Sequence, residues 1–333
     1  HLYGHSFPTR RSSDLKNLSK IYTDDRKSIV KAVNDITLQI YQGETFGLVG
    51  ESGCGKSTFG QMLVNLLEPT KGEILFEGED IFKSRRARKE IPQKIQMIFQ
   101  DPYSSLNPKR KIGWLLEESL DIHRKNLSKE QRIKIVDEML ELVGLDESYK
   151  DRYPSQLSGG QRQRVSIAIA LILNPKFVVC DEAVSALDVS VQAQILNLLH
   201  DLQEKFNLTY LFISHNLNVV SYMSDRIGVM YLGSIVELGD AVTLSKNPIH
   251  PYTKMLFSSS MNVGEADSGK VQITGELPSP SNPPSGCTFH TRCAYCTELC
   301  SSARPELQEL PDGRQIACHY AQKFYQESME KKQ

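Results

Sequence analysis

The sequence has almost no net charge and no long apolar segment. Its 39 Lys and Arg residues nearly balance its 40 Asp and Glu residues, for a net charge of −1. No global field therefore favours nucleic acid or an anionic membrane as a partner. No run of about 18 apolar residues would span a bilayer, and no signal-peptide pattern is present. These absences favour a cytosolic protein, in a compartment where thiols stay reduced.

Cysteine is sparse until the last part of the chain. Five of the seven cysteines fall there, in GCTFHTRCAYCTELC (Gly286–Cys300) and at Cys318. In a reducing compartment, clustered cysteines are better explained as metal ligands or redox groups than as disulfides. The residues alone leave three alternatives open: an iron–sulfur site, a zinc site and small buried apolar side chains.

The 333-residue length is typical of about two domains. Residues 1–15, HLYGHSFPTRRSSDL, show no hydrophobic periodicity, and TRRSSDL is also what a common sequencing-adapter end encodes in frame. We therefore expect residues 1–15 to be a non-native leader and exclude them from fold reasoning.

A glycine-rich loop lies between an apolar, β-branched run and a helical pattern. Glycines let backbone N–H groups surround phosphate oxygens, and the N-terminus of the following helix adds partial positive charge. Lys56 would contact the terminal phosphates, and the Ser57 hydroxyl would ligate Mg²⁺. The sequence therefore predicts a nucleotide site, because a plain glycine-rich turn would rarely place Lys-Ser here. The predicted loop comprises Gly50, Glu51, Ser52, Gly53, Cys54, Gly55, Lys56, Ser57 and Thr58.

Two carboxylates follow a second apolar run. Phe177–Cys180 reads as a short buried parallel strand, and Asp181 and Glu182 come directly after it. Ligands bind at this carboxyl edge in open α/β sheets. Asp181 is suited to hold Mg²⁺ through water, and Glu182 is suited to act as general base toward an attacking water.

A second glycine-rich helix start, Leu157–Gln161 (LSGGQ), precedes an amphipathic helical pattern. Its backbone N–H groups would favour an anion. One nucleotide does not need two such loops from the same chain, so we expect this one to serve a nucleotide held by another subunit. A simple helix cap is the alternative.

These segments together resemble the ATP-binding cassette (ABC) ATPases, over about residues 16–245. The resemblance implies an α/β P-loop NTPase fold with a helical subdomain inserted at about residues 101–165. A small cysteine-rich C-terminal extension (residues 246–333) would follow. The resemblance rests on Gly50–Ser57, Leu157–Gln161, Phe177–Glu182 and Ser214–His215.

Further roles follow from the resemblance alone. Gln100 would contact Mg²⁺ or the lytic water, and His215 would bridge the γ-phosphate and the catalytic machinery. Tyr22 would stack on adenine, and Asp188 would lie in a loop that signals across the dimer. One departure is Ala183, where the family usually has proline; we expect an altered loop stiffness and retained hydrolysis.

The resemblance also implies a head-to-tail dimer with two nucleotides at its interface. One ATP would be bound and hydrolysed by Lys56, Ser57, Asp181, Glu182 and His215. The nucleotide of the partner would be capped by Ser158, Gly159, Gly160 and Gln161.

Several segments are similar to the oligopeptide/dipeptide/nickel importer group, and Leu66–Ile81 to the second of its two ATPase subunits. The resemblance implies a peripheral protein at the cytoplasmic face of the cell membrane that powers import of oligopeptides or dipeptides. Its partners would be a second homologous ATPase, two transmembrane permease subunits and, indirectly, an extracytoplasmic solute-binding protein. The diagnostic segments are Phe99–Pro108, Ala183–Leu199, Asn247–Ser259 and Gly275–Cys293.

Two other functions remain as alternatives. One is a nickel or other solute importer of the same group, and the other a DNA-repair type ABC ATPase with a zinc module. The second fits less well because no long coiled coil interrupts the cassette. The basic run Lys83–Glu90 is short and lacks aromatic spacing, so we interpret it as a solvated helix and expect no nucleic-acid partner.

In this group the resemblance assigns the cysteines to a [4Fe-4S] cluster with four thiolate ligands. The matching positions are Cys287, Cys293, Cys300 and Cys318. Cys296 lies outside that pattern and forms CxxC with Cys293, and His290 and His319 are further possible zinc ligands. Zinc therefore stays open as the alternative metal.

Overall fold

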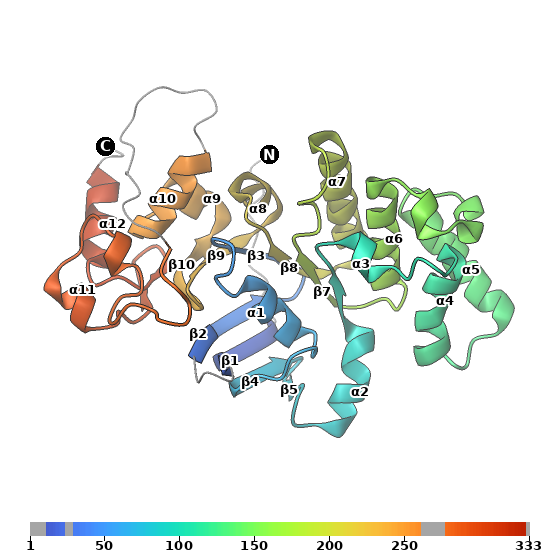
Figure 1. The fold of residues 1–333 in the computed structure, drawn as a ribbon, viewed down its shortest axis with the longest axis horizontal. Helices are drawn as coiled ribbons and strands as arrows, with labels where there is room; N and C mark the ends of the chain where they lie inside the picture. Colours follow the sequence, from blue (N-terminus) through green and yellow to red (C-terminus); the bar gives the residue numbers. More distant parts are fainter. Residues whose placement is uncertain (1–10, 24–28, 261–276, 331–333) are drawn as a thin grey trace.

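The computed structural model describes residues 11–23, 29–260 and 277–330. A mostly parallel central sheet forms the middle of this part of the chain, with a smaller antiparallel sheet beneath it (Figure 1). A group of helices extends to one side and the C-terminal extension to the other.

Within the described residues the central sheet has eight strands, in the order β11-β12-β10-β9-β3-β8-β7-β6. The five strands from β9 to β6 run parallel, and the remaining pairs are antiparallel. Every residue of β3, β7 and β8 is buried, as expected for parallel strands covered on both faces. The strands are β3 (Thr45–Val49), β6 (Ile95–Ile98), β7 (Phe177–Asp181), β8 (Thr209–Ile213), β9 (Arg226–Tyr231), β10 (Ser234–Asp240), β11 (Gln308–Glu309) and β12 (Gln315–Ile316).

The antiparallel sheet has the order β2-β1-β4-β5 and includes residues that the sequence analysis separated from the fold. Strand β1 begins at Arg11, and Leu15 is fully buried opposite Leu38 and Ile74. The boundary at residue 15 therefore falls inside a paired strand, whereas residues 1–10 lie outside the described residues. Several register shifts interrupt the pairing of β1 with β2, which explains the missing periodicity. The strands are β1 (Arg11–Thr23), β2 (Ile29–Tyr41), β4 (Lys71–Phe76) and β5 (Glu79–Asp80).

Helices cover both faces of the central sheet, and α3 to α6 gather at one end of the molecule (Figure 1). None of the helices in the described ranges has the length and apolar character needed to cross a bilayer. The α-helices are α1 (Lys56–Leu63), α2 (Arg85–Lys94), α3 (Pro102–Ser105), α4 (Ile112–His123), α5 (Lys129–Leu142), α6 (Gly159–Leu171), α7 (Val189–Phe206), α8 (Leu217–Met223), α9 (Ala241–Lys246), α10 (Pro251–Ser260), α11 (Glu298–Ser302) and α12 (Ala321–Glu330). Short 3₁₀ turns occur at Glu147–Asp151, Pro154–Gln156 and His290–Arg292.

Helix α1 is fixed by apolar packing between the two sheets. Its residues Phe59, Met62 and Leu63 are fully buried in a cluster that also contains Ile40 and Ile213. Burial of side chains of this size stabilises the fold by about 1.5–3 kcal/mol each. The N-terminus of α1 is thereby held at the carboxyl edge of β3.

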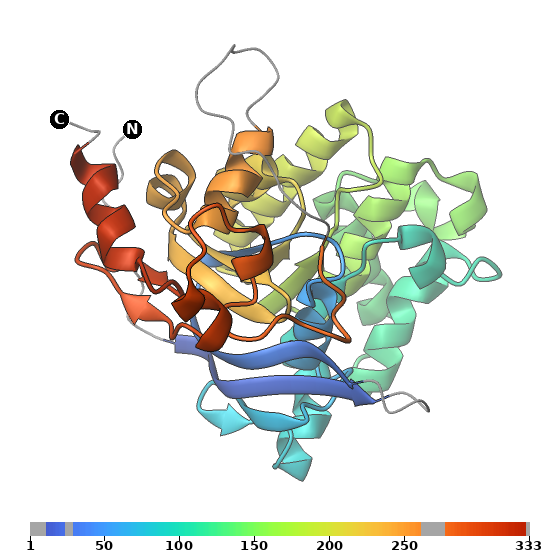
Figure 2. The same cartoon turned by 60° about the vertical axis from the view of Figure 1, so that its left-hand side comes forward.

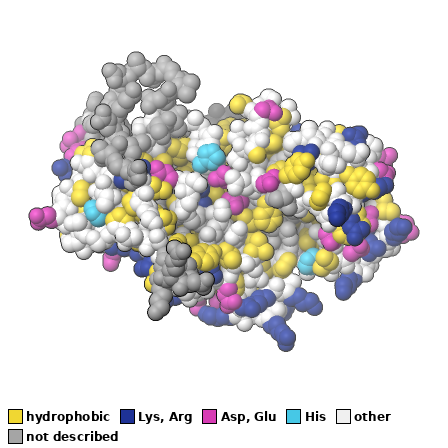
Figure 3. All heavy atoms as spheres, in the orientation of Figure 1, with side chains coloured by type: hydrophobic (Ala, Val, Ile, Leu, Met, Phe, Trp, Pro, Cys, Tyr) yellow, Lys and Arg dark blue, Asp and Glu magenta, His cyan; other side chains and the backbone are white. Residues whose placement is uncertain are grey.

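The basic run on α2 is solvated and offset by acidic side chains. Lys and Arg side chains gather along the lower edge of the molecule, over α2 and the neighbouring strands (Figure 3). Arg86 pairs with Glu90 on the same helix at 2.8 Å, and Arg88 reaches Glu68 at 3.3 Å. The interpretation of this run as a solvated helix agrees with these positions.

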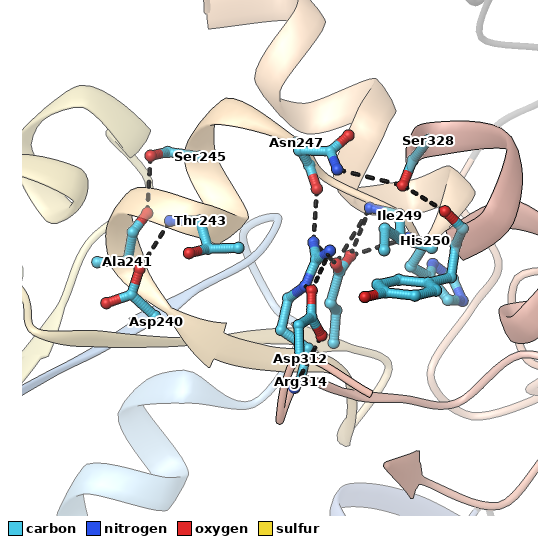
Figure 4. A network of polar contacts seen from close by, with 12 residues as sticks. Asp240, Ala241, Thr243, Ser245, Asn247, Ile249, His250, Asp312, Arg314 and Ser328 are labelled. Atoms are coloured by element: carbon cyan, nitrogen blue, oxygen red, sulfur yellow. Dashed lines mark hydrogen bonds and ion pairs between the residues drawn. The ribbon is translucent and has the colours of Figure 1, made fainter. Parts of the chain in front are cut away.

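The C-terminal extension joins the central sheet through β12, which pairs antiparallel with β10 (Figure 2). A buried polar network supports this junction (Figure 4). Arg314, only 2% exposed, donates to the carbonyl of Asn247 at 2.6 Å and to Asp312 at 2.9 Å. Glu237 on β10 accepts the backbone N–H groups of Ile249 and His250. The extension is therefore packed firmly against the cassette.

Candidate nucleotide-binding site

The phosphate loop connects β3 to α1 and depends on two glycines. Gly55 has φ +108°, and a Cβ there would lie 1.9 Å from the carbonyl oxygen of Ala32. A Cβ on Gly50 would lie 2.2 Å from the carbonyl oxygen of Met230. The loop thus passes too close to two backbone segments for any larger residue. This close approach places the loop at the carboxyl edge of the central sheet.

Lys56 and Ser57 occupy the first turn of α1 beside Asp181. The ammonium group of Lys56 is buried and donates to the carbonyls of Gly50 at 2.8 Å and Glu51 at 3.1 Å. The Ser57 hydroxyl donates to Asp181 Oδ1 at 3.1 Å. Burial raises the pKa of Asp181, and the hydrogen bond from Ser57 opposes that rise. Two oxygen ligands of the kind that Mg²⁺ prefers therefore lie side by side.

Gln100, Glu182 and His215 form a second group. Gln100 Nε2 donates to Glu182 Oε2 at 2.9 Å, and His215 Nδ1 lies 3.2 Å from the same oxygen. Glu182 has φ +48°, a left-handed conformation that costs free energy for a residue with a side chain. The strained backbone turns the carboxylate of Glu182 toward the side chains of Gln100 and His215. The buried Ala183 follows directly.

These residues share one cavity of about 720 Å³, a size typical of small-molecule sites. From the sequence-predicted set, the structure brings together on its wall Ser52, Gly53, Cys54, Gly55, Lys56, Ser57, Thr58, Gln100, Glu182 and His215. Asp181 adjoins the wall through Ser57. Cys54 is buried, and burial raises the pKa of its thiol, so the residue is not poised as a thiolate at neutral pH.

Tyr22 is not among the residues that line the cavity. It lies near the end of β1 opposite Val30, which does line the cavity, and its side chain is 41% exposed. The ammonium group of Lys20 lies 5.4 Å from the centre of its ring. Stacking of Tyr22 on adenine stays a prediction.

The LSGGQ segment lies outside the cavity wall and begins α6. Ser158 accepts the N–H of Gln161 at 3.3 Å, and Gln161 Oε1 accepts the N–H of Ser158 at 3.0 Å, which is a capping box. Within one chain, the LSGGQ segment therefore has the structure of a helix cap, which was the alternative interpretation. Asp188 caps the N-terminus of α7 in a similar way, through the N–H of Val191. Its pKa is lowered by that hydrogen bond.

The C-terminal extension contributes part of the cavity wall, which the sequence analysis missed. Most of these wall residues come from a proline-rich segment. Spacing between prolines indicates an extended backbone but not the surface against which that backbone lies. The wall residues from the extension are Pro280, Pro283, Pro284, Gly286, Thr288 and Arg304.

The four cysteines predicted as cluster ligands line one small cavity together with His250, His290 and His319. None of the seven cysteines, all in the described ranges, forms a disulfide. Burial, together with the neighbouring thiols, raises the pKa of Cys287 to about 11 and that of Cys318 to about 12. No group of three or more His, Cys, Asp or Glu side chains in the described residues is arranged to hold a metal ion. The four predicted cysteine ligands thus lie around one cavity, but their sulfur atoms are not in positions to coordinate a metal.

Two family models match the chain. The model for ABC transporters matches residues 33–185, and the model for the oligopeptide/dipeptide transporter C-terminal region matches residues 236–300. The first match contains the phosphate loop, the LSGGQ segment and both carboxylates. The second begins on β10 and includes three of the four predicted cluster cysteines.

Two relatives are similar to this chain along most of their length. The oligopeptide transport ATP-binding protein AppF of Bacillus subtilis (strain 168) is 49% identical over 295 residues, which cover 87% of this chain and 89% of AppF. The dipeptide transport ATP-binding protein DppF of Haemophilus influenzae is 48% identical over 293 residues, with coverage of 87% and 89%. A solved dimeric ATP-binding cassette, MJ0796, in a post-hydrolysis state with ADP and Pi, has a TM-score of 0.63 at 31% identity, over 69% of this chain and 98% of that one.

Proposed function

This chain belongs to the ATP-binding proteins of the oligopeptide/dipeptide ABC transporters, and from that premise we propose that it binds and hydrolyses ATP to power peptide import. The observation that carries the proposal is the cavity in which Lys56, Ser57, Gln100, Glu182 and His215 meet. Hydrolysis of a nucleoside triphosphate needs positive charge, a metal ligand and a base, and these side chains supply all three.

Each residue has a role that its position allows. When ATP binds, Lys56 turns from the loop carbonyls to the terminal phosphates. Ser57 and Asp181 would hold Mg²⁺, which would supply positive charge to neutralise the phosphate oxygens. Glu182 accepts a proton from the attacking water, and His215 and Gln100 orient that water through the shared carboxylate. The contacts of Glu182 with Gln100 and His215 keep the base in place before ATP arrives.

The functional unit is a head-to-tail dimer with a second, homologous ATPase subunit. Ser158, Gly159, Gly160 and Gln161 cap the nucleotide held by that subunit. Two observations support this: the segment does not line the cavity of its own chain, and the similar cassette MJ0796 forms a dimer. Closure of the dimer excludes water from the two sites, and hydrolysis reopens it.

Two transmembrane permease subunits and an extracytoplasmic solute-binding protein complete the proposed transporter. The chain attaches to the permeases at the cytoplasmic face of the membrane. Its cassette includes all of β1 and extends to residue 245, with a helical subdomain at about 101–165, and its extension comprises residues 246–333. The matched C-terminal family region supports the peptide importer group in particular.

The proposal is tested in vesicles that contain the complete transporter. We expect ATP-dependent uptake of a labelled dipeptide or oligopeptide that is abolished by Lys56→Ala. Labelled nickel, added in place of peptide, tests the alternative cargo. Uptake of nickel alone would contradict the peptide assignment, and uptake that persists in the Lys56→Ala complex would contradict the role of this site.

We further propose that Cys287, Cys293, Cys300 and Cys318 bind a [4Fe-4S] cluster. The gathering of all four around one cavity supports this donor set. Cluster binding would require the thiols to lose their protons and move into coordinating positions. The bound cluster would stabilise the proline-rich extension, whose own apolar core is small.

Metal analysis of anaerobically purified protein tests this assignment. We expect about four irons and four sulfides per chain, lost in the Cys318→Ser variant and retained in Cys296→Ser. The Cys296→Ser control is apt because Cys296 is exposed and lies outside the proposed ligand set. Stoichiometric zinc without sulfide would contradict the cluster assignment and show that the cysteines bind zinc.

A further inference from the structure

An arginine from the C-terminal extension forms an ion pair with the phosphate loop. Arg292 Nη1 and Nη2 donate to the two carboxylate oxygens of Glu51 at 2.8 and 3.0 Å. This parallel, two-bond geometry is the strongest form of an Arg–carboxylate contact. Arg292 is only 7% exposed, and its guanidinium lies 5.9 Å from the ring centres of both Tyr231 and Phe289.

A second residue of the extension holds the same loop position. The backbone N–H of Glu51 donates to the hydroxyl of Tyr252 at 2.9 Å. Tyr252 lies on α10 and is fully buried. Both the side chain and the backbone of Glu51 are therefore fixed by residues that lie far outside the phosphate loop in sequence. Pre-ordering of this kind lowers the entropy lost when the loop binds a ligand.

The charge of Glu51 makes the pair relevant to nucleotide binding. A carboxylate in a loop that must bind a polyphosphate would repel it, unless a cation neutralises the carboxylate. Arg292 supplies that cation from a buried position. The carbonyl of Glu51 also accepts a hydrogen bond from Lys56, so displacement of Glu51 would disturb the phosphate-binding lysine.

We propose that Arg292 is a positioning residue of the nucleotide site, which acts through Glu51 to hold the phosphate loop and to neutralise its carboxylate. The C-terminal extension thereby sets the affinity of the cassette for ATP. This inference rests on the proposed function, because it requires the loop to bind ATP.

Binding of a fluorescent ATP analogue to the purified full chain tests the inference. We expect Arg292→Gln to raise the Kd by about 5- to 20-fold, within the usual range of coupling between sites. The double variant Glu51→Gln/Arg292→Gln should regain most of the affinity, since it removes the unpaired carboxylate. In the assembled transporter, Arg292→Gln should raise KM for ATP and leave kcat unchanged.

The chain offers a matched control at Arg226. This residue donates to both oxygens of Glu44, at 3.2 and 3.4 Å, and lies near two aromatic rings at 5.1 and 5.5 Å. It does not line the nucleotide cavity. Arg226→Gln should therefore lower the melting temperature and leave the Kd unchanged. Metal content is measured in every variant, because Arg292 precedes Cys293.

The possible results distinguish failure of this inference from failure of the proposed ATP-binding function. If the wild-type chain does not bind the analogue, the proposed function and this inference both fail. If the wild type binds it and Arg292→Gln binds equally well, this inference alone fails. A double variant as weak as Arg292→Gln would refute the role of the Glu51 charge. If Arg292→Gln does not fold, Arg292→Lys takes its place, because it keeps the charge but loses the forked geometry. Its Kd should exceed that of the wild type, and an unchanged Kd overturns the inference.

Discussion

The hydroxyl of Ser57 and the carboxylate of Asp181 lie 3.1 Å apart, although 124 residues separate them in the chain. Ser57 comes from the first turn of α1 and Asp181 from the end of β7. Two strands of the parallel sheet, β3 and β7, direct these side chains to the same edge, with β8 between them. The sheet order thus brings the two proposed magnesium ligands together.

Asp181→Asn should separate stability from activity. Burial raises the pKa of Asp181 above its ordinary value, so folding opposes ionisation of this carboxyl. Stability is lost as the pH rises from the ordinary pKa to the raised one, and the full loss is present above both. The neutral amide avoids this loss and still accepts the hydrogen bond from Ser57. We expect a higher melting temperature at pH 8 without nucleotide, and hydrolysis at least about 100-fold slower.

Calorimetry and an ATPase assay on the same samples check both parts of that prediction. The gain in melting temperature should shrink as the pH falls toward the ordinary carboxyl range. A variant that melts below the wild type at pH 8 would show that ionised Asp181 stabilises the fold.

Glu182→Gln should stop hydrolysis while ATP still binds. Gln keeps the shape of the side chain and can accept the hydrogen bond from Gln100, but it cannot accept a proton from water. Loss of a general base lowers kcat by about 10²- to 10⁴-fold. The control is Glu204→Gln on α7, which removes the carboxylate of another Glu–His pair, His200–Glu204. Normal turnover in Glu182→Gln would assign the base to another residue.

The sequence predicted those parts of the site that depend on local pattern. The phosphate loop, the buried strand before Asp181 and the helix start at Ser158 all have signals within a few residues, and the structure contains each element where expected. The family resemblance is confirmed by the matched family models and the relatives.

The parts of the site that the sequence did not predict depend on contacts between residues far apart in the chain. Arg292 and Glu51 are 241 residues apart, and no periodicity or composition relates them. The same holds for Pro283 and Pro284, because no local pattern indicates their position on the cavity wall. In β1, register shifts removed the alternation that would have indicated a strand at Arg11. Contacts of this kind depend on the whole fold.

Ser158→Ala should show that the LSGGQ segment does more than cap a helix. Ser128 on α5 has the same capping box, with Gln131 in the role of Gln161. Either serine replaced by alanine should cost about 1 kcal/mol of stability. Only Ser158→Ala should lower ATP hydrolysis in the assembled transporter, because only Ser158 would contact the nucleotide of the partner. Equal activity in the two variants would leave Ser158 with a capping role alone.

Glu44 should give the protein a measurable dependence of stability on pH. Burial raises the pKa of Glu44 to about 7, and its partner Arg226 offsets only part of that rise. Between the ordinary pKa and about 7, the folded chain keeps a proton that the unfolded chain has released, so stability falls as the pH rises. Over this interval the wild type should lose up to about 3 kcal/mol relative to Glu44→Gln. Urea unfolding of both proteins at pH 5 and pH 8 measures this difference, and the contribution of every other titrating group cancels. A gap between the two proteins that stays constant with pH would mean that Arg226 keeps Glu44 ionised throughout.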